Sequence, residues 1–301
     1  MYELVQVSSQ CYYINCPAKI GVYKPEGTGK AENGVYLIDS GNDKDAGKKV
    51  RKVLEQQGWS LLGILTTHSN ADHIGGNKYL QDQTGCKVFA GGMEGAFTAW
   101  PLLEPTFLFG GFPMKEMRHK FLMAQPSEVT GFQDPDFPAK VEIIPLPGHF
   151  LDMVGYRMPD GTVFLADCIS SRMTLEKYGI PFIYDVESYL KTMDFVEGLE
   201  APVYVPSHTD VFTDAAELKA LTDFNRQNVY EISRRILEIC SGEAKCFEVI
   251  LKEVFEAYGL VMTFEQYVLV GSTVKSFLAW MKDAGKIQAE IQENMLVWSA
   301  V

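Results

Sequence analysis

The sequence lacks any run of about 18 apolar residues, the length that a membrane-spanning helix requires. Its first 20 residues, MYELVQVSSQCYYINCPAKI, also lack a basic stretch followed by an apolar one. We therefore expect no secretory signal and a cytoplasmic location. The six cysteines are spread thinly along the chain, which predicts mostly buried thiols and no metal site built from cysteine alone.

Positive charge is in short supply, because 27 lysines and arginines face 39 aspartates and glutamates, a formal net charge of −12. Such a surface repels phosphate backbones and anionic membranes over about a Debye length, roughly 8–10 Å in physiological salt. Nucleic acid and membranes are therefore not expected as partners, and a small-molecule substrate is. The chain also lacks internal repeats, and its 301 residues predict one large domain with a smaller appendage.

Short apolar runs separated by turn residues predict alternating strands and helices over the first two-thirds of the chain. We expect helices through 50–57 and from 75 to 83, and strands or hairpins at 34–41, 61–68, 87–91, 141–148, 154–167 and 201–208. This part, residues 1–211, is predicted to be the catalytic domain.

The pattern changes after residue 211. Helical periodicity is expected at 214–240, 243–257 and 263–282, and a hairpin with its turn at Glu293-Asn294 ends the sequence. The region 212–301 is therefore predicted to be a mainly helical appendage, and helices followed by a small hairpin resemble a winged-helix unit.

Histidine is rare, and four of the five histidines lie where strand-like runs end. His68, His149 and His208 follow such runs, His73 comes five residues after His68, and Asp167 ends another run. Side chains at strand ends can meet at the rim of a sheet. A single scattered histidine is more often a satisfied core or surface residue, but the joint pattern indicates a metal site.

The loop His68-Ser-Asn-Ala-Asp-His73-Ile-Gly-Gly places three metal donors within six residues. Imidazole nitrogen and carboxylate oxygen are good ligands for zinc and related ions. The spacing excludes the helical H-E-x-x-H type of site. We expect Gly75 and Gly76 to supply the backbone freedom that the tight turn needs.

The segment TTHSNADHIGGN (66–77) resembles the T-H-x-H-x-D-H-x-G-G signature of the metallo-β-lactamase superfamily. LIDSG (37–41), PGH (147–149), Asp167 and His208 resemble its other motifs in the family's order. The resemblance covers about residues 1–210. Asp167, and not a cysteine, stands at the bridging position, as in glyoxalase II-like thioesterases, phosphodiesterases and flavodiiron-type proteins, and among these the glyoxalase II-like branch is the one we expect. It implies an α/β fold, the αβ/βα sandwich of two mixed sheets with helices outside and metals at one edge.

The resemblance also implies roles for individual residues. His68 and His149 match ligands of a first metal, and Asp167 matches the carboxylate that bridges two metals. Ligands of the second metal are matched by Asp72, His73 and His208. The family implies one or two divalent ions, zinc before iron or manganese, with hydroxide on the metal as nucleophile and Asp72 as the residue that orients it.

Asn70 departs from the family pattern, which has a second histidine there. An amide oxygen is a weaker donor than imidazole for zinc-like ions, so we expect the second metal position to fill first and the first to be weak. Asn70 then ligates weakly through its oxygen, or hydrogen-bonds the nucleophile or substrate, or marks a site without turnover.

These residues predict a hydrolase that acts on a small ester, thioester or related acyl compound. One alternative is a hydrolase of small phosphodiesters or a nuclease, which would use the same metals. Another is a metal-binding sensing or interaction protein in which Asn70 has weakened catalysis.

An apolar insert, residues 91–140, separates the first motif from PGH and is rich in phenylalanine and methionine. It is interpreted as a lid or pocket wall, or equally as core packing or a contact in a homodimer. Within it, Lys115, Arg118, His119 and Lys120 form a basic cluster. This cluster either binds a substrate anion or, more simply, lies on a solvated helix face.

Overall fold

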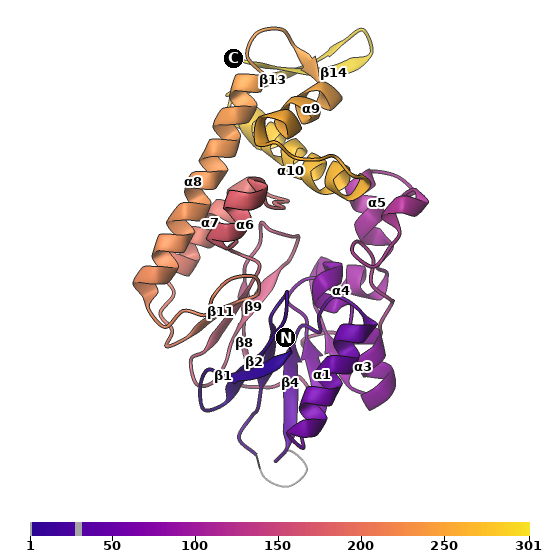
Figure 1. Ribbon diagram of the computed structural model, residues 1–301, viewed down its shortest axis with the longest axis vertical. Helices are drawn as coiled ribbons and strands as arrows, with labels where there is room; N and C mark the ends of the chain where they lie inside the picture. Colours follow the sequence, from indigo (N-terminus) through magenta and orange to yellow (C-terminus); the bar gives the residue numbers. More distant parts are fainter. Residues whose placement is uncertain (1, 28–31) are drawn as a thin grey trace. The chain divides into compact units, whose positions relative to one another are not determined.

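The chain folds into two units in the computed structural model, which describes residues 2–27 and 32–301 (Figure 1). The first unit contains the chain up to Pro147 together with Leu151–Cys168 and Leu199–Ala215. The second unit contains Gly148–Phe150, Ile169–Gly198 and Ala216–Val301.

A seven-stranded sheet in the order β1 to β7 is the centre of the first unit. Its strands are Glu3–Gln6, Cys11–Asn15, Ile20–Tyr23, Gly34–Ile38, Ser60–Leu65, Lys87–Phe89 and Val129–Thr130. The pairs from β1 to β4 are antiparallel, and those from β4 to β7 are parallel. Parallel neighbours need a crossover connection, and helices supply it here.

The helices α1 (Lys44–Gln56) and α3 (Asn77–Thr84) lie side by side over this sheet (Figure 1). Asp43 caps α1, since its side chain accepts a hydrogen bond from the backbone N–H of Ala46. The buried positions of α1 recur every three or four residues and contact the strands below, which is the pattern of a helix with one apolar face.

A second sheet has the order β11-β10-β9-β8. Its strands are β8 Glu142–Pro145, β9 Val154–Arg157, β10 Val163–Ala166 and β11 Tyr204–Pro206. The two sheets pack face to face through one apolar core, in which Leu65 and Phe89 of the first meet Tyr156 and Phe164 of the second. The predicted α/β sandwich of two mixed sheets packed face to face is thereby confirmed.

The insert folds as α4 (Gly92–Ala99), α5 (Leu103–Phe109), the 3-10 turn η2 (Lys115–Met117) and β7. Its apolar side chains fall into a buried group and an exposed group. Phe97 and Met117 are buried, whereas Trp100, Phe112 and Phe121 keep 72%, 70% and 65% of their surface exposed. Core packing therefore accounts for only part of the insert's apolar character.

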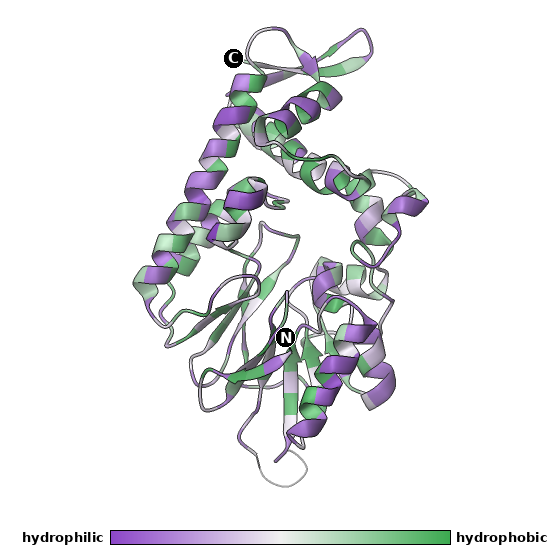
Figure 2. Ribbon diagram, in the orientation of Figure 1, coloured by the Kyte–Doolittle hydropathy of each residue, from purple (hydrophilic) through white to green (hydrophobic). Residues whose placement is uncertain are grey.

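The second unit is mainly helical, as predicted for the C-terminal region. It contains α6 Arg172–Tyr178, α7 Val186–Glu197, α8 Ala215–Ile239, α9 Phe247–Tyr258, α10 Phe264–Asp283, β12 Lys245–Cys246, β13 Ile287–Gln292 and β14 Met295–Ala300. Figure 2 shows hydrophilic and hydrophobic residues alternating along α8, whose buried positions recur at helical spacing. A three-stranded sheet, β12-β14-β13, combines the strand between α8 and α9 with the final hairpin. The likeness of this region to a winged-helix unit stays a prediction.

The predicted turn at Glu293 and Asn294 joins β13 to β14, and both residues have positive φ, 49° and 63°.

Residues 169–198, for which the sequence predicted no helices, form α6 and α7 and pack with the C-terminal helices. None of the helices in the described residues combines the length and apolar character needed to cross a membrane.

Candidate metal centre

The loop between β5 and the short helix α2 (Ala71–Ile74) carries a dense group of polar side chains. His68 and His73 have no solvent exposure, although neither belongs to a strand. Buried imidazoles need partners for their ring nitrogens, so the atoms around them show what the loop is built to hold.

Asp39, just beyond β4, fixes this loop. It is 2% exposed and its backbone is left-handed, with φ of 63°, a conformation that aspartate adopts more readily than most residues. Its Oδ1 accepts a hydrogen bond from the backbone N–H of Thr67 at 2.8 Å, and its Oδ2 lies 2.8 Å from Nδ1 of His73. A carboxylate behind an imidazole fixes the ring's orientation and tautomer, as in many metal sites.

Two further imidazoles of the first unit are held through the same ring nitrogen. Nδ1 of His68 lies 3.0 Å from Thr67 Oγ1, and Nδ1 of His208, beyond β11, lies 3.0 Å from the carbonyl oxygen of Pro17. Each ring is therefore oriented through Nδ1, and Nε2 becomes the nitrogen suited to bind a metal.

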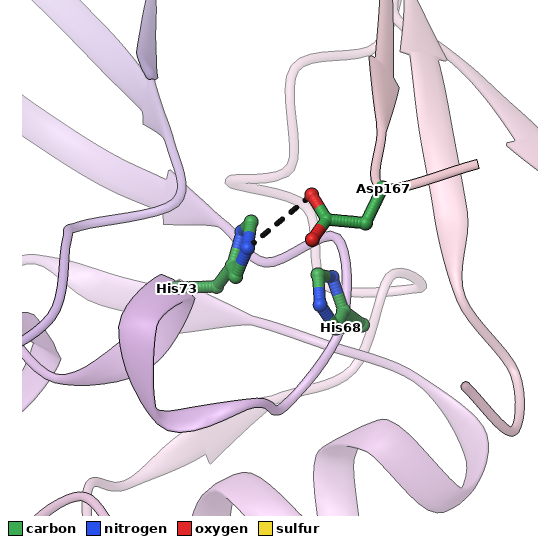
Figure 3. A group of neighbouring side chains, drawn as sticks. All are labelled: His68, His73 and Asp167. Carbon is green, nitrogen blue, oxygen red and sulfur yellow. Dashed lines mark ion pairs between the residues drawn. The ribbon is translucent and has the colours of Figure 1, made fainter. Parts of the chain in front are cut away.

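Nε2 of His73 and Nε2 of His208 converge on two carboxylates. The His73 nitrogen lies 3.4 Å from Asp167 Oδ1 and 3.6 Å from Asp72 Oδ2. The His208 nitrogen lies 3.2 Å from Asp167 Oδ2 and 3.3 Å from Asp72 Oδ2. In Figure 3 the Asp167 carboxylate faces the rings of His73 and His68, whose centroids are 4.0 Å apart.

These donors form two overlapping groups, and within each group the ligand atoms lie within 4.8 Å of one another. The groups are His68, His73 and Asp167, and Asp72, His73 and His208. The structure thus brings together five of the seven residues that the sequence proposed as metal ligands.

Asp167 and its neighbour Cys168 have different environments. The strand β10 ends at Ala166, whose φ of 51° turns the chain out of the ladder. The side chain of Asp167 keeps 12% exposure within the cluster, whereas Cys168 is fully buried and its burial raises the pKa of the thiol. A buried, neutral thiol fits the expectation that Asp167 supplies the ligand at this position.

The carboxylates and imidazoles shift one another's pKa values. Burial opposes a charge on His208, but Asp167 and Asp72 outweigh it and raise the His208 pKa to about 10. The pKa of His73 is likewise raised well above its usual range, against the effect of burial. The two imidazoles hold the pKa of both Asp167 and Asp72 below the usual range, although desolvation acts in the opposite direction. Such mutual perturbation is typical of functional sites.

This set of donors fits a divalent metal ion. Imidazole nitrogens and carboxylate oxygens are ordinary ligands of zinc, iron and manganese. Nε2 of His73 is buried and makes no hydrogen bond within the part of the chain that the structure describes. A metal ion would satisfy that nitrogen, which is the condition that buried polar atoms normally meet.

His149 lies in the second unit, within the segment Gly148–Phe150. Its Nδ1 is 3.0 Å from the carbonyl oxygen of Phe182, so this ring too is oriented through Nδ1. Gly148 has φ of 119°, and a Cβ there would lie 2.3 Å from the backbone nitrogen of Tyr189, which explains the glycine of the PGH motif. The role of His149 as a ligand of the first metal stays a prediction.

Asn70 occupies the N-cap position of α2, yet its side chain does not cap that helix. Its Nδ2 instead donates a hydrogen bond of 2.7 Å to Oε1 of Glu104 in α5. Glu104 is 3% exposed, and burial holds its pKa well above the usual range although the Asn70 hydrogen bond lowers it. The residue that departs from the family pattern therefore has a buried acidic partner.

A second buried glutamate holds the same loop. Oε2 of Glu94 accepts hydrogen bonds from the backbone N–H and the hydroxyl of Ser69, at 2.8 and 2.6 Å. Its Oε1 accepts one from the backbone N–H of Asp152 at 2.9 Å, and burial raises its pKa to about 7. Sequence reasoning missed Asp39, Glu94 and Glu104. The available signals were the aspartate of LIDSG and two acidic residues in an apolar insert.

The prediction that Gly75 and Gly76 supply backbone freedom to the loop is wrong. Their φ values, −60° and −84°, lie in the helical region that any residue adopts. A Cβ on Gly75 would lie 2.3 Å from the carbonyl carbon of Asn42, and one on Gly76 would lie 2.4 Å from the carbonyl oxygen of Ser40. Close backbone approach, and not conformational freedom, requires glycine at both positions.

The basic cluster of the insert does not form one helix face. Only Lys115 lies in η2, and Lys120 binds Asp43, the cap of α1, at 2.9 Å. The guanidinium of Arg118 lies over the ring of Phe112, 5.1 Å from its centroid. Two of these cations thus have intramolecular partners.

Comparisons with known proteins agree with this geometry. The family model described as the metallo-beta-lactamase superfamily matches residues 30–208. A "Beta-lactamase-like protein 2 homolog" of Drosophila melanogaster is 27% identical over 185 residues, which cover 59% of this chain and 56% of that protein. A "Hydroxyacylglutathione hydrolase" of Rhodopseudomonas palustris is 29% identical over 148 residues, covering 46% and 49%.

Two solved structures share the fold over nearly the whole chain. A beta-lactamase domain protein from Burkholderia ambifaria has a TM-score of 0.78 at 16% identity and covers 99% of this chain and 94% of that one. A metallo-beta-lactamase family protein from Thermus thermophilus has a TM-score of 0.72 at 15% identity, covering 97% and 99%. The chain spans about half the length of the two curated relatives. Because the family model matches more than half of the sequence, the chain belongs to the metallo-β-lactamase superfamily.

Proposed function

We propose that the chain is a metal-dependent hydrolase of small esters, thioesters or related acyl compounds. One observation carries the proposal: the Nε2 atoms of His73 and His208 both lie within 3.6 Å of the carboxylates of Asp167 and Asp72. A convergent cluster of imidazole and carboxylate donors is the arrangement that hydrolytic metal centres use.

The protein groups have distinct tasks in this proposal. A divalent metal bound there would lower the pKa of water to near 7 and polarise a carbonyl group. The Asp72 side chain is 46% exposed, against 12% for Asp167, so Asp72 is the carboxylate more accessible from solvent. Its lowered pKa keeps it ionised, and it can accept a hydrogen bond from the attacking water and orient it.

The substrate class rests on chemistry and on resemblance. The acidic chain, with its net charge of −12, disfavours long polyanions such as nucleic acids. Relatives named hydroxyacylglutathione hydrolase favour a thioester among acyl substrates. A small phosphodiester is the alternative, because the same donors could act on that electrophile.

The test uses the full chain, freed of metal with a chelator and reloaded with Zn²⁺, Mn²⁺ or Fe²⁺. Its substrates are S-lactoylglutathione, p-nitrophenyl acetate and bis(p-nitrophenyl) phosphate. We expect metal-dependent cleavage of the thioester or ester. Asp72→Asn should lower kcat about 100-fold or more, while Asp82→Asn on the exposed face of α3 should leave it unchanged.

The outcomes separate the candidates. Preferential cleavage of the phosphodiester would contradict the acyl assignment and support the alternative. Metal binding without turnover of any substrate would contradict the hydrolase and favour a sensing or interaction protein. Activity that persists without metal would overturn the proposal as a whole.

A further inference from the structure

The side chain of Asn70 adopts an arrangement that an N-cap asparagine seldom shows. Such a residue ordinarily accepts a hydrogen bond from a backbone N–H in the first helical turn. Here no such bond forms, and Nδ2 is a donor to Glu104 at 2.7 Å. An amide held by its nitrogen presents its oxygen on the other edge of the group.

Glu104 is an unusual partner, because it is only 3% exposed and no lysine or arginine of the described residues forms an ion pair with it. A buried carboxylate is unfavourable unless a cation or several donors compensate it. The Asn70 amide is a donor to this carboxylate, and a cation bound at the candidate metal centre would favour its ionised form.

The same chain offers a template for this arrangement. Asp39 lies 2.8 Å behind the Nδ1 of His73, and Glu104 lies 2.7 Å behind the Nδ2 of Asn70. In each case a buried carboxylate accepts a hydrogen bond from the N–H side of a planar group. Hydrogen bonding of this kind orients a metal ligand and makes its donor atom more basic.

We propose that Glu104 is a positioning residue that orients and polarises the Asn70 amide, so that Asn70 Oδ1 replaces the missing histidine as a metal donor. The inference rests on the proposed metal centre and deepens it. An amide is a weak ligand by itself, and a carboxylate behind it makes its oxygen a stronger donor.

A direct role of Glu104 as a ligand is less well supported. Its carboxylate belongs to neither of the two donor groups formed by the described residues. A purely structural role would bind α5 to the loop without any effect on metal coordination. Both alternatives predict results that differ from those expected if Glu104 acts on the metal through Asn70.

The test is a Co²⁺ titration of the metal-free full chain, followed by the visible absorption of the bound ion. Glu104→Gln keeps the volume of the side chain and replaces the carboxyl group by an amide that cannot ionise. We expect the affinity for the weaker equivalent of Co²⁺ to fall about 10- to 100-fold, with a changed d–d spectrum. Asn70→Ala should lower this Co²⁺ affinity by the same factor.

The control is Asp160→Asn, which likewise replaces a carboxylate by its amide, at a residue that is bonded to Ser8 and lies outside the proposed donor groups. This change should leave the Co²⁺ spectrum unaltered. The Asn70→Ala/Glu104→Gln double variant should bind Co²⁺ as tightly as Asn70→Ala alone, because Glu104 acts through Asn70. Thermal unfolding of each metal-free variant checks folding, and Asn70→Ala at a half-exposed position keeps the test valid if Glu104→Gln does not fold.

Three outcomes would overturn the inference. One is an unchanged affinity and spectrum in Glu104→Gln or in Asn70→Ala. Another is an equal loss in Asp160→Asn, which would indicate that the effect is not specific to Glu104. A further loss from Glu104→Gln in the Asn70→Ala background would indicate that Glu104 ligates directly. In all three outcomes the more tightly bound Co²⁺ ion still binds. A chain that binds no Co²⁺ at all would refute the proposed function itself.

Discussion

Oδ2 of Asp39 lies 2.8 Å from Nδ1 of His73 and accepts a 2.7 Å hydrogen bond from Oγ1 of Thr67. One buried carboxylate therefore fixes both the backbone of the metal-binding loop and the ring of a proposed ligand. Its left-handed backbone, with φ of 63°, shows that the turn after β4 is shaped to deliver this side chain.

Asp39→Asn should weaken metal binding without unfolding the protein. Asparagine tolerates the left-handed backbone and keeps the shape, but it removes the charge that supports His73. We expect about 10- to 100-fold lower Zn²⁺ affinity in a competition titration with a chromophoric chelator. Asp160→Asn, which alters an aspartate bonded to Ser8, is the control and should not change the affinity. Equal affinities of Asp39→Asn and wild type would show that Asp39 does not support the metal ligand.

Gly76→Ala should destabilise the first unit through backbone crowding. The added Cβ would lie 2.4 Å from the carbonyl oxygen of Ser40, so α2 must move away from the turn after β4. Overpacking of this kind costs about 1–3 kcal/mol. Urea unfolding of metal-free protein measures the loss, and Gly131→Ala, where a Cβ meets nothing within 4 Å, should lose much less. Similar losses for both glycines would contradict the close approach.

The stability of the second unit should depend on the charge of Glu197. Its carboxylate accepts hydrogen bonds from Lys219 and Arg226, at 2.9 and 2.6 Å, and these bonds outweigh burial and lower its pKa to about 2. An unfolded chain takes up this proton near its ordinary value of 4.5. The stabilisation is therefore complete above that pH and disappears as the pH falls towards 2.

Glu197→Gln should accordingly lower the free energy of unfolding at pH 7 by about 1–2 kcal/mol, a discounted figure because the partners are partly exposed. Near pH 2.5 the variant and the wild type should differ much less. Glu187→Gln removes an exposed pair with Lys191 on the same helix and should cost much less. A loss in Glu197→Gln that is independent of pH would mean that packing, not charge, explains it.

Asn70→His should strengthen the weaker metal position. Imidazole is a better ligand than an amide oxygen for zinc-like ions, so the metal content should rise from about one towards about two ions per chain. Elemental analysis of protein purified without added metal or chelator measures this directly. About two ions in the wild type would contradict a weak first position and show that Asn70 already ligates effectively or is dispensable.

Much of the candidate site could be predicted because metal ligands have a distinctive chemistry and order. His68, Asp72 and His73 share one loop, and Asp167 and His208 follow strand-like runs, so the sequence locates them at sheet ends. The buried carboxylates behind the ligands could not be predicted in the same way. Glu104 and Asn70 are 34 positions apart, and only the path of α5 brings them together.

The fold shows the same division between local and distant causes. The helix α8 and the hairpin β13–β14 were predictable, because apolar periodicity and the turn residues Glu293 and Asn294 are local signals. The strand β4 ends at Ile38, three residues earlier than predicted, because Asp39 leaves the ladder to hold the metal-binding loop. The predicted boundary between domains at residue 211 stays a prediction.

The measurement that tests the central claim most directly is the metal content of Asp167→Ala beside that of the wild type. Asp167 lies within 3.4 Å of both His73 Nε2 and His208 Nε2, so its loss removes the carboxylate that these two imidazoles share. Elemental analysis should find at least about one ion per chain in the wild type and almost none in a folded Asp167→Ala variant, which should also be inactive. Full metal content and activity in Asp167→Ala would contradict the assignment of this cluster as the catalytic centre.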